Sequence, residues 1–321
     1  MLINLPNRAY LADLERFVDL IEDDGKADLT FRMRDGLFSL HPIVLCMVAA
    51  LTDRPYDEGH AVSVTNVLPN ASTRYLERMQ LFNHMHLPNV VEVVAHEPAG
   101  RFIPVNRIST NTELNAFVTD LVPLLHASPG EADSVKYVLY ELVRNVLEHS
   151  GSAHGAYAAA QVTKSGRLLI GVADSGIGVL STIRRSHSAA DDSEGIAQAF
   201  RPGITGTTSN YGGNETNGGA GLFFMKAMAT LSRHHMVMVS GDSMMKLLTQ
   251  PKDRKPEIHA TLGEDRVKWH NMRTPFPGTA VGIDITVNDT LAFSQLLAEI
   301  REVYHLNVRK SKKAKRKAKF S

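Results

Sequence analysis

The stretch from Ser134 to His149 constrains the fold more than any other part of the sequence. Its apolar residues recur every three or four positions, the spacing that places them along the core-facing side of a helix. They are Val135, Val138, Leu139, Leu142, Val143, Val146 and Leu147. Glu141, Asn145 and Glu148 fall at positions i, i+4 and i+7, so they stack on another face, with His149 close to them. We predict a core helix with one unusually polar face.

This polar face has two interpretations. A carboxylate and a carboxamide one turn apart can share a hydrated divalent cation and orient a water molecule. Mg²⁺ prefers oxygen ligands and keeps several waters, so one Asn oxygen together with substrate phosphates is enough to hold it. Alternatively, the same residues form an ordinary solvated helix face. The helix alone leaves both interpretations open.

A second pattern, DSGIGV from Asp174 to Val179, directly follows the predicted strand RLLIGVA. An Asp at the end of a strand can accept a hydrogen bond from an exocyclic amine. Gly176 and Gly178 lack Cβ atoms, so a flat ring or a phosphate can approach the backbone there. The alternative is an ordinary strand-ending turn, which Asp and Gly favour.

Two further patterns lie downstream. In NGGAGLFFMKAMA, glycines run into a helix, an arrangement that offers free N–H groups and the positive end of the helix dipole to an anion. The Gly-rich stretch before it, Gly203 to Gly218, is predicted to be a lid, with a flexible surface loop as the alternative. In PGTAVGIDI, Thr279 begins a strand that we expect beside Asp174.

The order and spacing of these four patterns resembles the GHKL ATP-binding superfamily. That group includes gyrase, the heat-shock chaperone ATPases, sensor histidine kinases and the mismatch-repair MutL proteins. The resemblance spans roughly residues 111–288. It implies an α/β (α+β) protein of the Bergerat type, which is a two-layer sandwich of a mixed sheet with helices packed on one face. It also implies that the chain binds ATP and Mg²⁺.

The resemblance further implies a role for each polar residue. Asn145, in ELVRNVLEH, matches the residue that ligates Mg²⁺, and Glu141 matches the acidic residue that activates water or a phosphoacceptor. Asp174 matches the residue that binds the adenine amine, and Thr279 helps through water. Phosphoryl transfer needs positioning and charge neutralisation more than covalent help, and this set supplies both.

The glycines also have matching positions, with one departure. Gly176 and Gly178 would line the base and ribose side. Gly219 and Gly221 match a second glycine box, whose N–H groups meet the phosphates. In the family that box continues with a further glycine, where this chain has Phe223. The phosphoacceptor-histidine helix and the dimerisation hairpin of conventional sensor kinases have no counterpart in the sequence.

The sequence divides into five predicted segments. They are a STAS-like regulatory α/β domain at 1–95, a strand-bearing connector at 96–110, the ATP-binding domain at 111–290, a helix at 291–308 and a basic, disordered tail at 309–321. The STAS-like resemblance depends on strand and helix order around PIVLCMVAAL. The phosphorylatable Asp-Ser pair of STAS antagonists is absent, and Ser39 and His41 do not match it.

Local patterns predict further elements. Apolar spacing predicts a helix over 10–23, and ADLTFRM and HAVSVTNVL are typical of strands. A second amphipathic helix is expected to begin with Ser72 as its cap. Residues 250–277 are expected to form a polar excursion between two strands.

The net charge of +1 hides two regions of opposite sign. The tail, RKSKKAKRKAKFS, carries eight of the 35 basic residues, which leaves 27 basic against 34 acidic side chains, a net −7. A run of like charges is usually solvated, but it can also contact a polyanion or nucleic acid in a salt-dependent way. Organised base stacking is not expected, because Phe320 is the tail's only aromatic residue.

Cysteine content and hydropathy restrict the location of the chain. The single cysteine, Cys46, excludes a disulfide framework and a cysteine-based zinc site, and it fits a reducing compartment. The N-terminus has no basic region followed by an apolar stretch, so no signal peptide is expected. The longest apolar run, Pro42 to Leu51, is shorter than the ~20 residues that span a bilayer. We predict a cytoplasmic protein without membrane contact.

The leading hypothesis is a Mg²⁺-dependent ATP-binding switch, an ATPase or histidine-kinase-like phosphotransferase. Its lid would close over ATP and change the surface offered to a regulatory protein partner. A non-catalytic ATP-sensing scaffold or antitoxin-like partner is the main alternative, and an anti-sigma-type serine kinase is a third. Phe223 favours the non-catalytic alternative, and Glu141 favours catalysis. A homodimer is left open.

Overall fold

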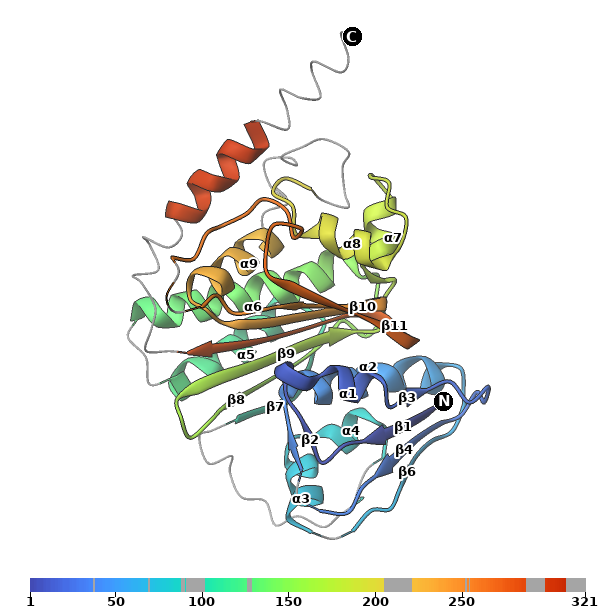
Figure 1. Ribbon diagram of the computed structural model, residues 1–321. Helices are drawn as coiled ribbons and strands as arrows, with labels where there is room; N and C mark the ends of the chain where they lie inside the picture. The colour runs from blue at the N-terminus through green and yellow to red at the C-terminus, as the bar shows by residue number, and fades with distance from the viewer. Residues whose placement is uncertain are drawn as a thin grey trace.

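The computed structural model contains a five-stranded, a four-stranded and a two-stranded β-sheet (β2-β5), and a long helix lies between the two larger sheets (Figure 1). It describes residues 1–36, 38–68, 70–87, 90, 102–125, 129–204, 221–251, 253, 255–286 and 298–309. Within these ranges no helix is long and apolar enough to cross a membrane. The fold is mixed α/β, as the sequence predicts.

The larger sheet has five strands in the order β10-β11-β9-β8-β7, and its described pairs are all antiparallel. The strands are β7 (Phe102–Ile108), β8 (Ala156–Val162), β9 (Arg167–Asp174), β10 (His235–Leu247) and β11 (Val267–Thr286). Strand β7 lies inside the expected connector at 96–110. This part of the connector therefore forms one edge of the sheet.

Both faces of this sheet are buried, because its side chains alternate between them with a period of two. On β9, Ile170 and Val172 belong to one hydrophobic core, whereas Ala173 belongs to a second core on the opposite face. On β11, Val281 belongs to the first core and Ala280 to the second. The sheet thus separates two cores.

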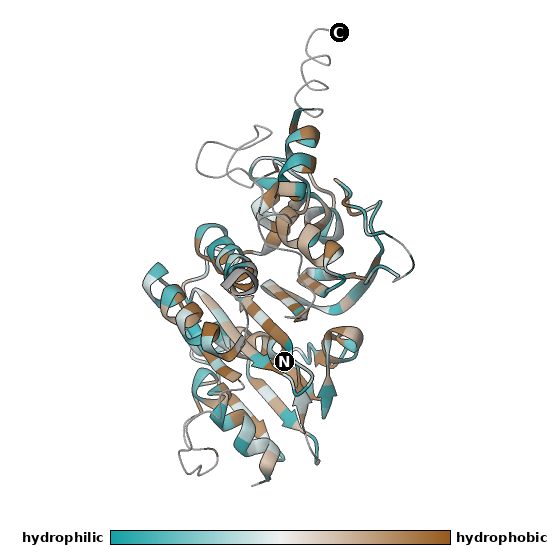
Figure 2. Ribbon diagram, turned by 90° about the vertical axis from the view of Figure 1, so that its left-hand side faces the viewer, coloured by the Kyte–Doolittle hydropathy of each residue, from teal (hydrophilic) through white to brown (hydrophobic). Residues whose placement is uncertain are grey.

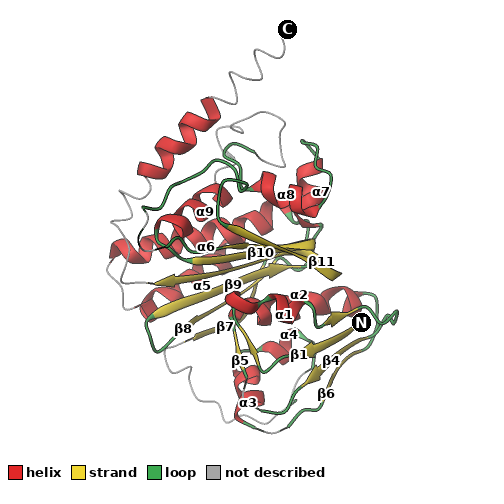
Figure 3. Cartoon of the chain, viewed as in Figure 1, coloured by secondary structure: helices red, strands yellow, loops and turns green. Residues whose placement is uncertain are grey.

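Helices cover the first face (Figure 3). They are α5 (Asn111–Leu125), α6 (Pro129–His149) and α9 (Gly221–Leu231), with α7 (Gly178–Arg184) and α8 (Asp192–Ala199) at one end. The apolar stripe predicted for 134–149 lies on α6 and is buried in this core, which confirms the prediction. Neither α7 nor α8 was expected from the sequence.

The predicted C-terminal helix is present over 298–309, and the other residues of 291–308 lie outside the described ranges. Tyr304 places its ring against Phe223 and Phe224 of α9. This contact attaches the helix to the first core. Residues 310–321 of the tail also lie outside the described ranges, so polyanion binding stays a prediction.

The second face is covered by helix α2 (Pro42–Asp57), which comes from the N-terminal part of the chain. Gly171 and Gly282 are paired on neighbouring strands beneath it. A Cβ atom on Gly171 would lie 2.1 Å from the backbone nitrogen of Ile43, and one on Gly282 would lie 2.6 Å from Leu11. The glycines therefore let the start of α2 lie directly against the strand backbone. Because it is enclosed between two sheets, α2 is apolar nearly all round.

The smaller sheet lies on the other side of α2 and has the strand order β3-β1-β4-β6. It is mixed, because β1 is antiparallel to β3 and parallel to β4. Its strands are β1 (Leu2–Leu5), β3 (Ile21–Glu22), β4 (Leu29–Met33) and β6 (Val62–Thr65). The other N-terminal elements are β2 (Arg8–Ala9), η1 (Leu11–Asp13), α1 (Glu15–Val18), β5 (Ser39–Leu40), α3 (Ala71–Arg78) and α4 (Leu81–His84). In Figure 2 brown, hydrophobic residues mark the strands of both sheets.

Three local predictions are wrong. The expected helix over 10–23 is divided into η1, α1 and β3. Glu15 binds Lys246 at 2.5 Å and Asp19 lies 2.8 Å from His270, so contacts with the β10–β11 hairpin hold these short elements. The expected polar excursion over 250–277 is shorter, because β11 already begins at Val267.

The cap of α3 is the third correction. Asn70, not Ser72, caps this helix, and its side chain accepts hydrogen bonds from the backbone N–H groups of Ser72 and Thr73. The hydroxyl of Ser72 instead accepts a hydrogen bond from the backbone of Phe38 at 2.7 Å. A long-range contact thus uses the group that the local pattern assigned to the cap.

Candidate functional site

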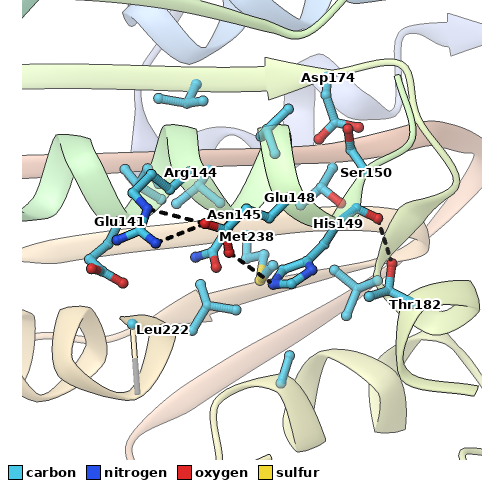
Figure 4. A pocket seen from close by; sticks show the side chains of 18 of the residues that line it. Glu141, Arg144, Asn145, Glu148, His149, Ser150, Asp174, Thr182, Leu222 and Met238 are labelled. Atoms are coloured by element: carbon cyan, nitrogen blue, oxygen red, sulfur yellow. Dashed lines mark hydrogen bonds and ion pairs between the residues drawn. The ribbon is translucent and has the colours of Figure 1, made fainter. Parts of the chain in front are cut away.

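A cavity of about 300 Å³ lies between α6, α7, α9 and the strands β9 and β11. Of the residues to which the resemblance assigns a role, those lining it are Glu141, Asn145, Asp174, Gly178, Gly221 and Thr279. Figure 4 shows Glu141 and Asp174 toward opposite ends, with Asn145 between them. The fold therefore brings five separate segments of the chain to one site.

Asp174 ends β9 and is only 1% exposed. Its Oδ1 accepts a hydrogen bond from the backbone N–H of Gly176 at 2.8 Å, and the sheet register pairs it directly with Thr279. Burial raises the pKa of Asp174 to about 7, an effect that the N–H groups of Gly176 and Thr279 partly oppose. One end of the cavity thus carries a carboxyl group that titrates near neutral pH.

The backbone around Asp174 is packed too closely for side chains. A Cβ atom on Gly176 would lie 2.2 Å from the carbonyl oxygen of Ser150. Gly278 has a φ of +79°, and a Cβ atom there would lie 2.6 Å from Oδ1 of Asp174. The first glycine belongs to the predicted motif, whereas Gly278 was not recognised as a site residue.

Ser240 fixes the neighbouring backbone. Its buried hydroxyl accepts a hydrogen bond from the N–H of Val179 at 2.9 Å and donates to the carbonyl of Gly278 at 2.8 Å. One side chain on β10 thereby links the start of α7 with β11. Gly178, which begins α7, has a φ of +76°, a conformation that a residue with a Cβ atom rarely adopts.

At the other end of the cavity, the polar face of α6 meets the first turn of α9. A Cβ atom on Gly221 would lie 2.1 Å from Oε2 of Glu141 and 3.6 Å from Nδ2 of Asn145. Glycine at the start of α9 therefore leaves room for the Glu141 carboxylate. Burial raises the pKa of Glu141, the charge of Glu148 adds to this, and Arg144 opposes it.

Asn145 has a buried amide nitrogen, Nδ2, without a hydrogen-bond partner in the described part of the chain. A buried polar group left unpaired costs about 1–3 kcal/mol, so a ligand that supplied a partner would bind favourably here. No group of three or more His, Cys, Asp or Glu side chains among the described residues could hold a metal ion. A divalent cation at this site would thus take one oxygen from Asn145 and the others from water and phosphate, which suits Mg²⁺.

Further polar residues line the cavity, and of these the sequence indicated only Glu148 and His149, on the polar face of α6. Arg144 pairs with Glu148 at 2.8 Å, and Glu148 lies 3.9 Å from His149. Burial lowers the pKa of His149. The hydroxyl of Thr182 donates to the carbonyl of His149 at 3.3 Å (Figure 4). The i, i+4 spacing of Arg144 and Glu148 indicates their ion pair in the sequence. Thr182 lies on helix α7, which the sequence did not predict.

Three expected features are not among the cavity residues. Gly176, predicted to line the base side, does not line the cavity. Gly219 and residues 205–218 of the predicted lid lie outside the described ranges, although Ile204 and Gly221 on either side both line the cavity. Phe223 is fully buried and contacts Phe224 and Tyr304 through its ring. Phe223, at the position where the resemblance would have a glycine, therefore packs in the core.

Sequence comparison gives no relative for this chain. No protein-family model matches it, and no curated protein matches it significantly. The geometry of the cavity is therefore the basis for assigning a function.

Proposed function

We propose that the protein binds Mg·ATP in this cavity and acts as a nucleotide-dependent switch, an ATPase or kinase-like phosphotransferase of the GHKL type. The cavity-bearing unit would have the Bergerat fold, and the N-terminal sheet with its helices would be a STAS-like regulatory unit. One observation carries the proposal: six residues chosen for nucleotide chemistry line a single cavity. A set of unrelated surface residues would not converge in this way.

The Asp174 end suits an adenine ring. Its buried carboxylate is an acceptor for the exocyclic amine, and the neighbouring Thr279 offers a hydroxyl or a water-mediated contact. Gly178 leaves the approach open, and Val172 and Val281 provide apolar walls. A few polar groups in a mostly apolar cleft are typical of small-molecule sites.

The Glu141 end suits the phosphates. The start of α9 offers backbone N–H groups and a positive dipole to them. Asn145 would supply the protein oxygen to Mg²⁺, which when bound neutralises phosphate charge. Glu141, with its raised pKa, would accept the proton of the attacking water or hydroxyl group. The i, i+4 spacing of the two residues places the base beside the metal ligand.

Binding without turnover is the alternative function. Phe223 favours it if the phosphate loop has an altered shape, but its ring is buried against Phe224 and Tyr304. The docking of the C-terminal helix is thus another explanation for this residue. Catalysis fits the position of Glu141 better, because its carboxylate lies at the start of α9.

Calorimetry with Mg·ATP tests the binding site. We expect Asp174→Asn to weaken binding at least about tenfold, because it removes the charged acceptor. Asp133→Asn is the matched control, since this carboxylate lies on α6, is exposed and pairs only with Lys136 in the structure described. Equal affinities of wild type and Asp174→Asn would refute the adenine assignment.

Hydrolysis measurements separate the two functions. Glu141→Gln keeps the size of the side chain but removes the base, so we expect ATP turnover to fall about 100-fold while Mg·ATP still binds. Turnover absent from the wild type would support the binding-only alternative. Turnover that is unchanged in Glu141→Gln would exclude Glu141 as the base.

A further inference from the structure

Asp174 and Ser175 are consecutive residues whose side chains point to opposite faces of the large sheet. Asp174 lines the cavity. The hydroxyl of Ser175 donates a hydrogen bond to Oδ2 of Asp53 at 2.5 Å, and Asp53 lies on α2, 122 residues earlier in the chain. Ser175 directly follows the end of β9, so a base-binding residue and a contact to the N-terminal unit stand side by side in the sequence.

Asp53 is almost completely buried, with 1% of its surface exposed. Its other oxygen, Oδ1, accepts a hydrogen bond from the hydroxyl of Tyr157 at 2.5 Å and lies 3.7 Å from Nδ1 of His154. A buried carboxylate is costly unless it is hydrogen-bonded. Both oxygens of Asp53 have partners from the large sheet and its adjoining turns, so α2 is bound to that sheet by a polar contact as well as by apolar packing.

The turn from Asp174 to Gly178 is held at three points, besides a 3.5 Å contact between the hydroxyls of Ser175 and Ser152. Gly176 donates to Asp174 itself, and Ile177 donates its N–H to the carbonyl of Ser150 at 2.8 Å. The third point is the bond from Ser175 to Asp53. Of these three contacts, only the third joins the turn to α2. A displacement of α2 would therefore move Ser175, which is the residue next to Asp174 in the chain.

We propose that Asp53 is a positioning residue for the nucleotide cavity. By holding Ser175 it fixes the 174–178 turn, and through this bond the placement of α2 sets the affinity for Mg·ATP. This inference rests on the proposed function, and it adds the route by which the N-terminal unit regulates that site. Asp53 touches no nucleotide group and acts through Ser175.

The charge of Asp53 provides a second measurable effect on the cavity, through the pKa of Asp174. Its carboxylate contributes to the raised pKa of Asp174, so removing the charge should lower that pKa. Burial raises the pKa of Asp53, and hydrogen bonds from Ser175 and Tyr157 oppose this. The remaining titratable or charged groups around Asp53 are Asp57, His84, His86, Arg107 and His154.

Four variants separate positioning from general packing. Ser175→Ala removes the bond and keeps the charge, whereas Asp53→Asn removes the charge and weakens the bond. Tyr157→Phe is the matched control, because it removes the other hydrogen bond to Asp53 and leaves Ser175 in place. Ser175→Thr retains the hydroxyl and is expected to restore the wild-type behaviour.

Amide hydrogen exchange of the ligand-free protein tests the anchor without nucleotide. We expect faster exchange at Gly176 and Ile177 in Ser175→Ala and Asp53→Asn, and wild-type exchange there in Tyr157→Phe and Ser175→Thr. Unchanged exchange in Ser175→Ala would overturn the proposal. So would equal acceleration by Tyr157→Phe, because the effect would then be a general loosening of the α2 interface.

Calorimetry then measures the effect on Mg·ATP. Loss of one charge-assisted hydrogen bond should weaken binding about tenfold in Ser175→Ala. Asp53→Asn should in addition move the midpoint of the pH-dependent affinity to lower pH, a shift that a purely structural role would not give. Wild-type affinity and midpoint in both variants would overturn the proposal. If the wild type binds no Mg·ATP, the proposed function fails, and the exchange experiment still decides whether Asp53 anchors the turn.

Discussion

The two faces of the five-stranded sheet are packed differently, although the same strands form both. On the α2 face, Gly171 and Gly282 bring a helix into backbone contact with the strands. On the α6 face, larger side chains such as Ile170 and Val172 support the helices, and about 300 Å³ is left open. One face is therefore packed in close contact with a helix, whereas the other leaves a cavity, where we propose that the nucleotide binds.

A single strand contributes both to the close contact with α2 and to the cavity. Residues of β9 and β11 alternate between the faces, so Asp174 and Thr279 face the cavity while Ala173 and Ala280 face α2. The small residues on the α2 face therefore do not restrict which polar residues can occupy the cavity face. The same substitution, glycine to alanine, should consequently have different effects on the two sides of the sheet.

Gly171→Ala should have the largest effect on stability. Its Cβ atom would lie 2.1 Å from the backbone of Ile43, which cannot move without shifting α2. We expect the free energy of unfolding to fall by about 3 kcal/mol, as in overpacked cores. Urea denaturation measures this loss.

Gly263→Ala is the matched control for that variant. A Cβ atom on Gly263 would have no neighbour within 4 Å, so the free energy of unfolding should change by less than about 0.5 kcal/mol. Equal losses in the two variants would mean that α2 does not lie against β9.

Gly221→Ala should affect activity more than stability. Its Cβ atom would meet Oε2 of Glu141 at 2.1 Å, but this is the end of a flexible side chain that can swing away. We expect the free energy of unfolding to change by less than about 1 kcal/mol, because alanine favours helices. A displaced base should lower ATP turnover about 100-fold.

Urea denaturation and a turnover assay of the same preparation check both halves of this prediction. A loss of stability as large as that of Gly171→Ala, with full turnover in the folded fraction, would contradict the assigned difference between the two faces.

Periodicity and motif spacing were sufficient to predict the core of the cavity-bearing unit. The apolar stripe on α6 and the strand pair carrying Asp174 and Thr279 are where the sequence predicts them. The stripe is a local signal, and the pairing of Asp174 with Thr279 depends only on the register of two adjacent strands. The buried face of α6, the pairing of β9 with β11 and six of the cavity residues therefore follow from the sequence.

The missed features depend on contacts between distant parts of the chain. The bond from Ser175 to Asp53 joins residues 122 positions apart, and nothing in either segment alone indicates it. The reason for glycine at both Gly171 and Gly282 is apparent only when α2 is packed over the two strands. Helix α8 had one unused local signal, since Asp191 caps it by accepting a hydrogen bond from the N–H of Glu194.

The pH dependence of Mg·ATP affinity is the most direct test of adenine binding at Asp174. The pKa of Asp174 is about 7 without nucleotide, and an adenine amine would bind its ionised form. At lower pH the carboxyl is protonated and must lose that proton before binding, so affinity should rise with pH up to about 7 and then level off. Asp174→Asn should bind more weakly, without this dependence. Affinity with the same pH profile in wild type and variant, or no binding by the wild type, would contradict the account.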